Sequence, residues 1–132
     1  MRNRMLNSNA TYLLRRMGHR DLLAVTDAGY NNPSEVETID LALVPNVPTL
    51  MQVIDAILLE VSVETVYLAE EIKTLAPSIL EEYSLRFPNV DFQYLPHVPD
   101  FDKLVHQCKG VIRTGQYGFH AANCVLKIAC DY

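Results

Sequence analysis

Basic residues are few and scattered in this 132-residue chain. Eleven Lys and Arg stand against sixteen Asp and Glu, which leaves a formal net charge of −5. They never cluster beyond the pair Arg15-Arg16. A nucleic-acid-binding surface needs a basic stripe that neutralises phosphates. We therefore expect no nucleic-acid partner.

Long hydrophobic runs are also missing. The most apolar stretch, residues 47–63, is interrupted by Gln52, Asp55 and Glu60. It falls short of the roughly 18 uninterrupted residues that a membrane span requires. The opening MRNRMLNSNA carries two arginines but no apolar segment behind them, so we expect no signal peptide. Together these absences predict no membrane association and a cytoplasmic location.

Cysteine is scarce, odd in number and without any CxxC spacing. The three residues are Cys108, Cys124 and Cys130. This usage favours reduced thiols packed as small hydrophobic side chains over a disulfide framework. It agrees with the expected cytoplasmic location.

The motifs of several common chemistries are absent. None of the five glycines lies in a GxGxxG or GxxxxGK pattern, and no GxSxG is present. Nucleotide chemistry and serine hydrolysis therefore have no support. The four histidines, His19, His97, His106 and His120, show no HxH, HxxxH or HExxH spacing. We expect no metal and no cofactor; a metal held by residues distant in sequence stays open as the alternative.

What is present is an ordinary globular composition, with 49% hydrophobic and 20% charged residues. This apolar share excludes disorder, and the length suits one domain over residues 1–132 that buries roughly two-thirds of its unfolded surface. Helical spacing and short apolar runs alternate along the chain. They predict helices over residues 7–17, 48–58, 77–83 and 100–108, and strands over residues 22–26, 38–44, 64–69 and 90–95 and near 111 and 125. The alternation predicts a three-layer α/β sandwich with a largely parallel central sheet.

Polar residues follow several of these strands. Asp27 ends the first strand, the pair Glu70-Glu71 ends the third, His97 follows the fourth, and Thr114-Gly115 follows the fifth. Ligands of such sheets gather beyond the carboxyl ends of the strands, so these positions locate a site without identifying a reaction. Adjacent strand residues point to opposite faces, so we expect a solvated or capping role for at least one of the two glutamates.

Three candidate residues, His19, Asp27 and His97, have both a functional and a plain structural interpretation. His19, after the first predicted helix, is either a proton shuttle near neutral pH or a helix C-terminal histidine stabilised by the helix dipole. Asp27 either lines a cleft or forms a turn ahead of a glycine. His97, in a proline-flanked loop, either binds a ligand or is an incidental loop residue.

Several segments, in order, resemble the D-ribose pyranase family, relatives of fucose mutarotase. They are MGHRDLLAVTDAG at 17–29, IDLAL at 39–43, VP at 47–48, MQV at 51–53, AEEIK at 69–73, His97, and VIRTG at 111–115. The resemblance covers residues 6–126, and the DAG with its upstream GH favours the ribose branch over the fucose branch. It implies the fold of that family and a cofactor-independent isomerase (mutarotase).

Such an isomerase interconverts the pyranose and furanose forms of a free monosaccharide, D-ribose or a related sugar. Opening and closing the ring needs only proton transfers, to which a positioned imidazole contributes typically about 10²–10⁴-fold. By the resemblance, His19 is the catalytic residue, and Asp27 and His97 bind the sugar.

One segment departs from the family pattern, which has Tyr-x-Asn shortly after Arg-Thr-Gly. Here Asn123 matches, but Ala121 stands two residues before it, and His120 or Tyr117 is left as the substitute. We therefore predict His120 and Asn123 as further substrate-binding residues. Losing the phenol could cost roughly 1–3 kcal/mol if its sugar partner goes unpaired. The alternative function is a non-catalytic monosaccharide-binding or regulatory protein of the same fold.

The resemblance also implies a homo-oligomer, a decamer of two stacked pentameric rings. Its sites would lie between neighbouring subunits, with the Asn123 segment supplied by the adjacent chain.

Overall fold

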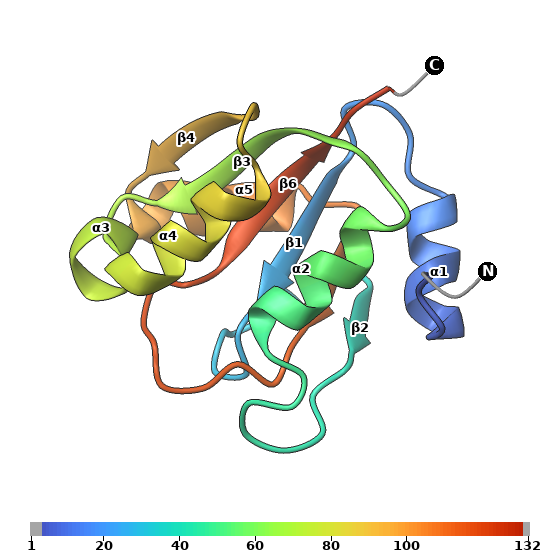
Figure 1. Cartoon of the computed structure of the whole chain (residues 1–132), viewed down its shortest axis with the longest axis horizontal. Helices are drawn as coiled ribbons and strands as arrows, with labels where there is room; N and C mark the ends of the chain where they lie inside the picture. The colour runs from blue at the N-terminus through green and yellow to red at the C-terminus, as the bar shows by residue number, and fades with distance from the viewer. Residues whose placement is uncertain (1–3, 131–132) are drawn as a thin grey trace.

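The computed structural model describes residues 4–130, and a six-stranded sheet forms the centre of that part of the chain (Figure 1). The strands are β1 (Leu22–Thr26), β2 (Thr38–Asp40), β3 (Val63–Ala69), β4 (Asp91–Leu95), β5 (Gly110–Arg113) and β6 (Cys124–Ile128). Their order in the sheet is β2-β5-β1-β6-β3-β4. β6 is antiparallel to both of its neighbours, whereas the other adjacent pairs are parallel.

Helices cover both faces of this sheet. They are α1 (Ser8–Arg15), α2 (Leu50–Leu58), α3 (Ile72–Leu75), α4 (Pro77–Arg86), a kinked π-helical segment η1 (His97–Phe101), and α5 (Asp102–His106). One buried cluster joins α1, α2 and α4 to one face, and a second joins η1 and α5 to the other (Figure 1). The strands serve both clusters because successive side chains point to opposite faces, as with Val111 and Ile112 of β5. The predicted three-layer α/β sandwich with a mostly parallel sheet is confirmed.

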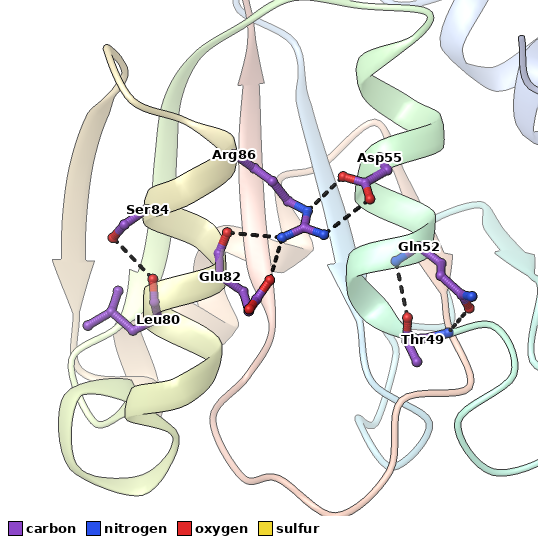
Figure 2. Close-up of polar contacts among 7 residues, drawn as sticks. All are labelled: Thr49, Gln52, Asp55, Leu80, Glu82, Ser84 and Arg86. Carbon is purple, nitrogen blue, oxygen red and sulfur yellow. Dashed lines mark hydrogen bonds and ion pairs between the residues drawn. The ribbon is translucent and has the colours of Figure 1, made fainter. Parts of the chain in front are cut away.

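Local sequence signals explain where α2 begins and how it meets α4. The side chain of Thr49 accepts a hydrogen bond from the backbone of Gln52, which reaches back to the backbone of Thr49 (Figure 2). This capping box satisfies two backbone donors at the start of the helix. Figure 2 also shows Arg86 of α4 bridging Asp55 of α2, at 2.6 and 3.1 Å, and Glu82 of its own helix.

The strand predicted over residues 38–44 is too long, because β2 ends at Asp40. Beyond it the chain folds back on itself: the backbone of Leu43 donates to the carbonyl of Val47 at 2.9 Å, and Asn46 takes a positive φ of 65°. Of the apolar residues that suggested a strand, Leu43 and Val44 are exposed here, at 76% and 54%. The short helix α3 and the π-helical segment η1 were not predicted, and α5 begins two residues later than expected.

The cysteines divide into two kinds. Cys108 and Cys124 are buried, as expected, and burial raises the pKa of each thiol to about 12. Cys130 is exposed, so the expectation that all three pack as hydrophobic side chains is wrong for this residue.

Within residues 4–130, no helix is long and apolar enough to cross a membrane.

Gly115 connects the end of β5 to the folded-back loop. Its N–H donates to the carbonyl of Pro48 at 2.8 Å, and its own carbonyl accepts from the N–H of Asn46 at 2.6 Å. A Cβ at this position would lie 2.6 Å from the carbonyl oxygen of Val47 and 2.9 Å from that of Val44. The backbone of the loop therefore leaves no room for a side chain.

We expect Gly115→Ala to lower the free energy of unfolding by about 1–3 kcal/mol, because the added methyl must displace backbone atoms. Urea unfolding followed by circular dichroism measures the change. Gly18→Ala is the matched control, since its Cβ would meet no atom closer than 3.7 Å. A Gly115→Ala variant as stable as the control would contradict this packing.

Candidate functional site

A cleft of about 930 Å³ opens beyond the carboxyl ends of β1, β3 and β4. Its walls come from the loops that follow these strands, from the start of α5, and from the segment that leads into β6. Four of the five predicted site residues line it: Asp27, His97, His120 and Asn123. The cleft therefore lies beyond the carboxyl ends of the strands, where the sequence predicted a site.

Asp27 is the buried acid of the cleft, only 8% exposed. Its Oδ1 accepts a hydrogen bond from the N–H of Gly29 at 3.0 Å, so it also forms the turn that the sequence suggested. Burial raises the pKa of this carboxyl, and the Gly29 N–H and the nearby His120 and His97 partly oppose the rise. The site thus contains a poorly solvated acid whose charge is balanced by local donors and imidazoles.

Asn123 lies beside Asp27 in the same chain. Its Oδ1 accepts a hydrogen bond from the backbone N–H of Asp27 at 2.6 Å, and both residues are buried. The preceding carbonyl, that of Ala122, accepts a hydrogen bond at 2.6 Å from the hydroxyl of Tyr83, which is fully buried in α4. Burial raises the pKa of the Tyr83 phenol, which keeps it a donor. The cleft therefore contains Asn123 without a second chain, unlike the expectation that an adjacent chain supplies this segment.

His97 is fixed from several sides. Its backbone N–H donates to both carboxylate oxygens of Glu71, at 3.0 and 3.3 Å. Its ring stacks on Phe101, with centroids 5.9 Å apart, and forms a T-shaped contact with the ring of Tyr30, with centroids 6.3 Å apart. Glu70 instead forms an exposed ion pair with a lysine one turn on, the solvated role expected for at least one of the two glutamates. Glu71 is thus a cleft residue that shapes the loop carrying His97.

The segment before β6 forms the open rim of the cleft. Tyr117, Phe119 and His120 are exposed and all line it, so both candidates for the missing family tyrosine are present. Ala121 has a φ of 61°, a left-handed backbone that non-glycine residues seldom adopt. It is 9% exposed, and its methyl offers no polar group to a ligand.

Tyr30 and Asp102 are cleft residues that the sequence did not predict. The hydroxyl of Tyr30 donates to Oδ1 of Asp102 at 2.6 Å, across a separation of 72 residues. Burial, and then the hydrogen bond to Asp102, raise the pKa of the Tyr30 phenol. No local pattern relates residues so far apart; the only available signal was that Tyr30 closely follows Asp27.

His19 does not line the cleft of its own chain. It precedes β1, whereas Asp27 follows it, and the five residues of this strand alone span about 16 Å. The His19 Nε2 lies 3.0 Å from Glu64 Oε1, and the histidine side chain is 45% exposed. The structure therefore brings four of the predicted residues together at the carboxyl ends of the strands. His19, the predicted catalytic residue, lies before the amino end of β1, away from the cleft.

The cleft combines acids, imidazoles and amides. Among the residues described at its surface there is no lysine or arginine. In residues 4–130, no three His, Cys, Asp or Glu side chains are placed to hold a metal ion together. Carboxylate, imidazole and amide groups form directional hydrogen bonds with hydroxyl groups, and an imidazole can transfer a proton. The arrangement suits a polyhydroxylated, uncharged ligand.

Known proteins resemble this chain over nearly its full length. The D-ribose pyranase of Geobacillus thermodenitrificans is 37% identical over 131 residues, which cover 99% of this chain and 98% of that protein. The D-ribose pyranase of Lactobacillus gasseri is 40% identical over 112 residues, 85% of each chain.

Two solved structures are also similar to this chain over nearly its full length. The structure of Bacillus subtilis RbsD complexed with D-ribose matches with a TM-score of 0.93 and 32% identity, covering 100% of this chain and 99% of that one. The Streptococcus pneumoniae fucose mutarotase in complex with L-fucose has the same fold, with a TM-score of 0.82, 20% identity and coverages of 96% and 94%.

The sequence model of the RbsD / FucU transport protein family matches residues 1–130. The resemblance noted in the sequence is thereby confirmed across the whole fold. The chain belongs to the RbsD / FucU transport protein family.

Proposed function

We propose that this chain is a monosaccharide ring-form isomerase that interconverts the pyranose and furanose forms of D-ribose or a related free sugar. The observation that carries the proposal is the cleft, where the buried carboxyl of Asp27 lies with the imidazoles of His97 and His120, and where the described lining residues include no lysine or arginine. Support also comes from the 37% identity to a D-ribose pyranase over 99% of the chain and from the likeness to RbsD complexed with D-ribose.

The reaction requires proton transfers at two oxygens. Ring opening removes a proton from the anomeric hydroxyl and delivers one to the ring oxygen, and closure through a different hydroxyl reverses both transfers. No electrons or groups are transferred, so the proposal includes no cofactor. In this proposal the cleft residues Asp27, Asn123, His97 and His120 hold the sugar hydroxyls, and an imidazole acts as the proton shuttle, because it can both accept and donate a proton.

His19 takes part in this proposal as a residue contributed by a second copy of the chain. It lies about a strand length, about 16 Å, from the cleft of its own chain and is exposed. A homo-oligomer would bring the edge carrying His19 against the cleft of a neighbour, and we propose the decamer of two pentameric rings. Exposed apolar side chains next to the cleft, at Leu43, Val44 and Tyr117, supply surface for such a contact.

A second candidate is a non-catalytic sugar-binding or regulatory protein. The observation that favours it is Ala121, which places a buried methyl where the family pattern has a tyrosine. A cytoplasmic location completes the proposal for both candidates, supported by the acidic composition and the two buried thiols of Cys108 and Cys124.

We expect His19→Gln to slow pyranose–furanose exchange of D-ribose by about 100-fold or more while leaving sugar binding in place, because it removes a proton shuttle. Exchange NMR measures the rate, and saturation-transfer NMR measures binding. An unchanged rate would assign the proton transfers to the imidazoles already in the cleft.

Mixed oligomers test whether His19 acts in a neighbouring copy. Co-expressing His19→Gln with Asp27→Asn chains should restore about a quarter of the native activity, because that fraction of random neighbour pairs joins an intact His19 to an intact Asp27. Variants assembled separately and then mixed are the control. If co-expression restores nothing, His19 of one copy does not act with Asp27 of its neighbour.

The raised pKa of Asp27 predicts how stability depends on pH. The folded carboxyl binds its proton more tightly than the unfolded one, whose pKa is about 3.9. The part of the unfolding free energy that depends on Asp27 therefore falls as pH rises from about 4 through the folded pKa.

Asp27→Asn keeps an oxygen for the Gly29 N–H but removes the charge. We expect the variant to melt at a higher temperature than the native protein at neutral pH, and the difference to vanish near pH 3. Thermal melts across this range measure it. A variant less stable than the native protein at pH 7 would show that the Asp27 charge stabilises the fold.

A further inference from the structure

Tyr30 and Asp102 form a polar pair in the cleft to which the proposed function gives no role. Tyr30 lies three residues after Asp27, and Asp102 is the first residue of α5, five residues after His97. Both line the cleft, and both are partly buried. The pair therefore links the two loops that carry the predicted sugar-binding residues.

The carboxylate of Asp102 has a fixed orientation. Its Oδ1 accepts the Tyr30 hydroxyl hydrogen bond at 2.6 Å, and the Tyr30 ring packs edge-on against His97. Phe101, the preceding residue, is fully buried and stacks on the same imidazole. Among the described residues no donor is bonded to Oδ2 of Asp102. One oxygen is thus used to orient the group, and the other is available to a ligand in the cleft.

The charges around this pair limit what the ligand can be. Asp27, Glu71 and Asp102 all line the cleft, and no lysine or arginine is among the described residues of its surface. Glu71 is already bonded to the backbone of His97, which leaves Asp27 and Asp102 as the acidic groups that face a ligand. A ligand that supplies hydroxyl donors fits such a surface, whereas a phosphate or carboxylate group would lie beside Asp27 and Asp102 with no lysine or arginine among the described cleft residues of this chain to pair with it.

We propose that Asp102, oriented by Tyr30, is a specificity-determining residue of the sugar site: it accepts a hydrogen bond from a hydroxyl of the bound sugar and excludes sugars that carry an anionic group. The inference rests on the proposed function for the nature of the ligand. It adds a residue that acts on binding and not on proton transfer.

The test measures dissociation constants by calorimetry for two probes, D-ribose and D-ribose 5-phosphate, together with ring exchange of D-ribose by NMR. Asp102→Asn keeps the shape and the acceptor for Tyr30 but removes the charge. We expect it to weaken D-ribose binding by about 10-fold, the usual effect of losing a charge-assisted hydrogen bond. The preference for D-ribose over its 5-phosphate should fall by at least about 10-fold, and the kcat of exchange should change by less than about threefold.

Asp100→Asn is the matched control, because it removes the same charge from the same segment at an exposed position outside the cleft lining. It should leave both dissociation constants unchanged. Tyr30→Phe keeps the ring against His97 but loses the hydroxyl, and it should weaken D-ribose binding in the same direction as Asp102→Asn.

Three results would overturn the role of Asp102: an unchanged preference in Asp102→Asn, an equal change in Asp100→Asn, or a native protein that binds D-ribose 5-phosphate as tightly as D-ribose. Failure of the proposed function looks different. In that case the native protein binds D-ribose without accelerating ring exchange, and the ratio of dissociation constants still decides the role of Asp102.

Discussion

The site depends on one buried hydrogen bond, from the backbone N–H of Asp27 to the side chain of Asn123. At 2.6 Å it joins the end of β1 to the start of β6 across 96 residues of sequence. Tyr83 reaches the same point from α4 through the carbonyl of Ala122. Because both ends are buried, an unmade bond here would cost on the order of 1–3 kcal/mol. Asp27, the acid of the cleft, is thus positioned by contacts that connect the end of β1, the segment before β6, and α4.

The antiparallel strand β6 explains why this contact exists. It lies between β1 and β3, so its first residue meets the carboxyl ends of both neighbours. A parallel strand would have placed the Asn123 segment at the other edge. The resulting cleft contains acids, imidazoles and amides, which can form hydrogen bonds with sugar hydroxyls, and its imidazoles can transfer protons.

Much of the fold and half of the site could be predicted from local patterns. Alternating helices and apolar strands predicted the layers, and the positions of Asp27 and His97 after strands predicted the correct edge. The extent of β2 could not be predicted, because Leu43 and Val44 are apolar but exposed in a folded-back loop. The pairing of Tyr30 with Asp102 depends on tertiary packing across 72 residues, which no spacing rule encodes.

The position of His19 shows a different kind of limit. Since it precedes the strand that Asp27 follows, the sequence already implied that the two lie at opposite edges of the sheet. The family resemblance assigned His19 and Asp27 to one site. Within a single chain, however, Asp27 lines the cleft and His19 does not. The proposed oligomer, in which a second copy supplies His19, would reconcile the assignment with the geometry.

The central claim is that this cleft accelerates sugar ring interconversion. Exchange NMR of D-ribose with catalytic amounts of the native protein tests it most directly. The account predicts pyranose–furanose exchange faster than in buffer alone, in proportion to protein concentration. Binding of D-ribose with an exchange rate equal to that of free sugar would contradict it.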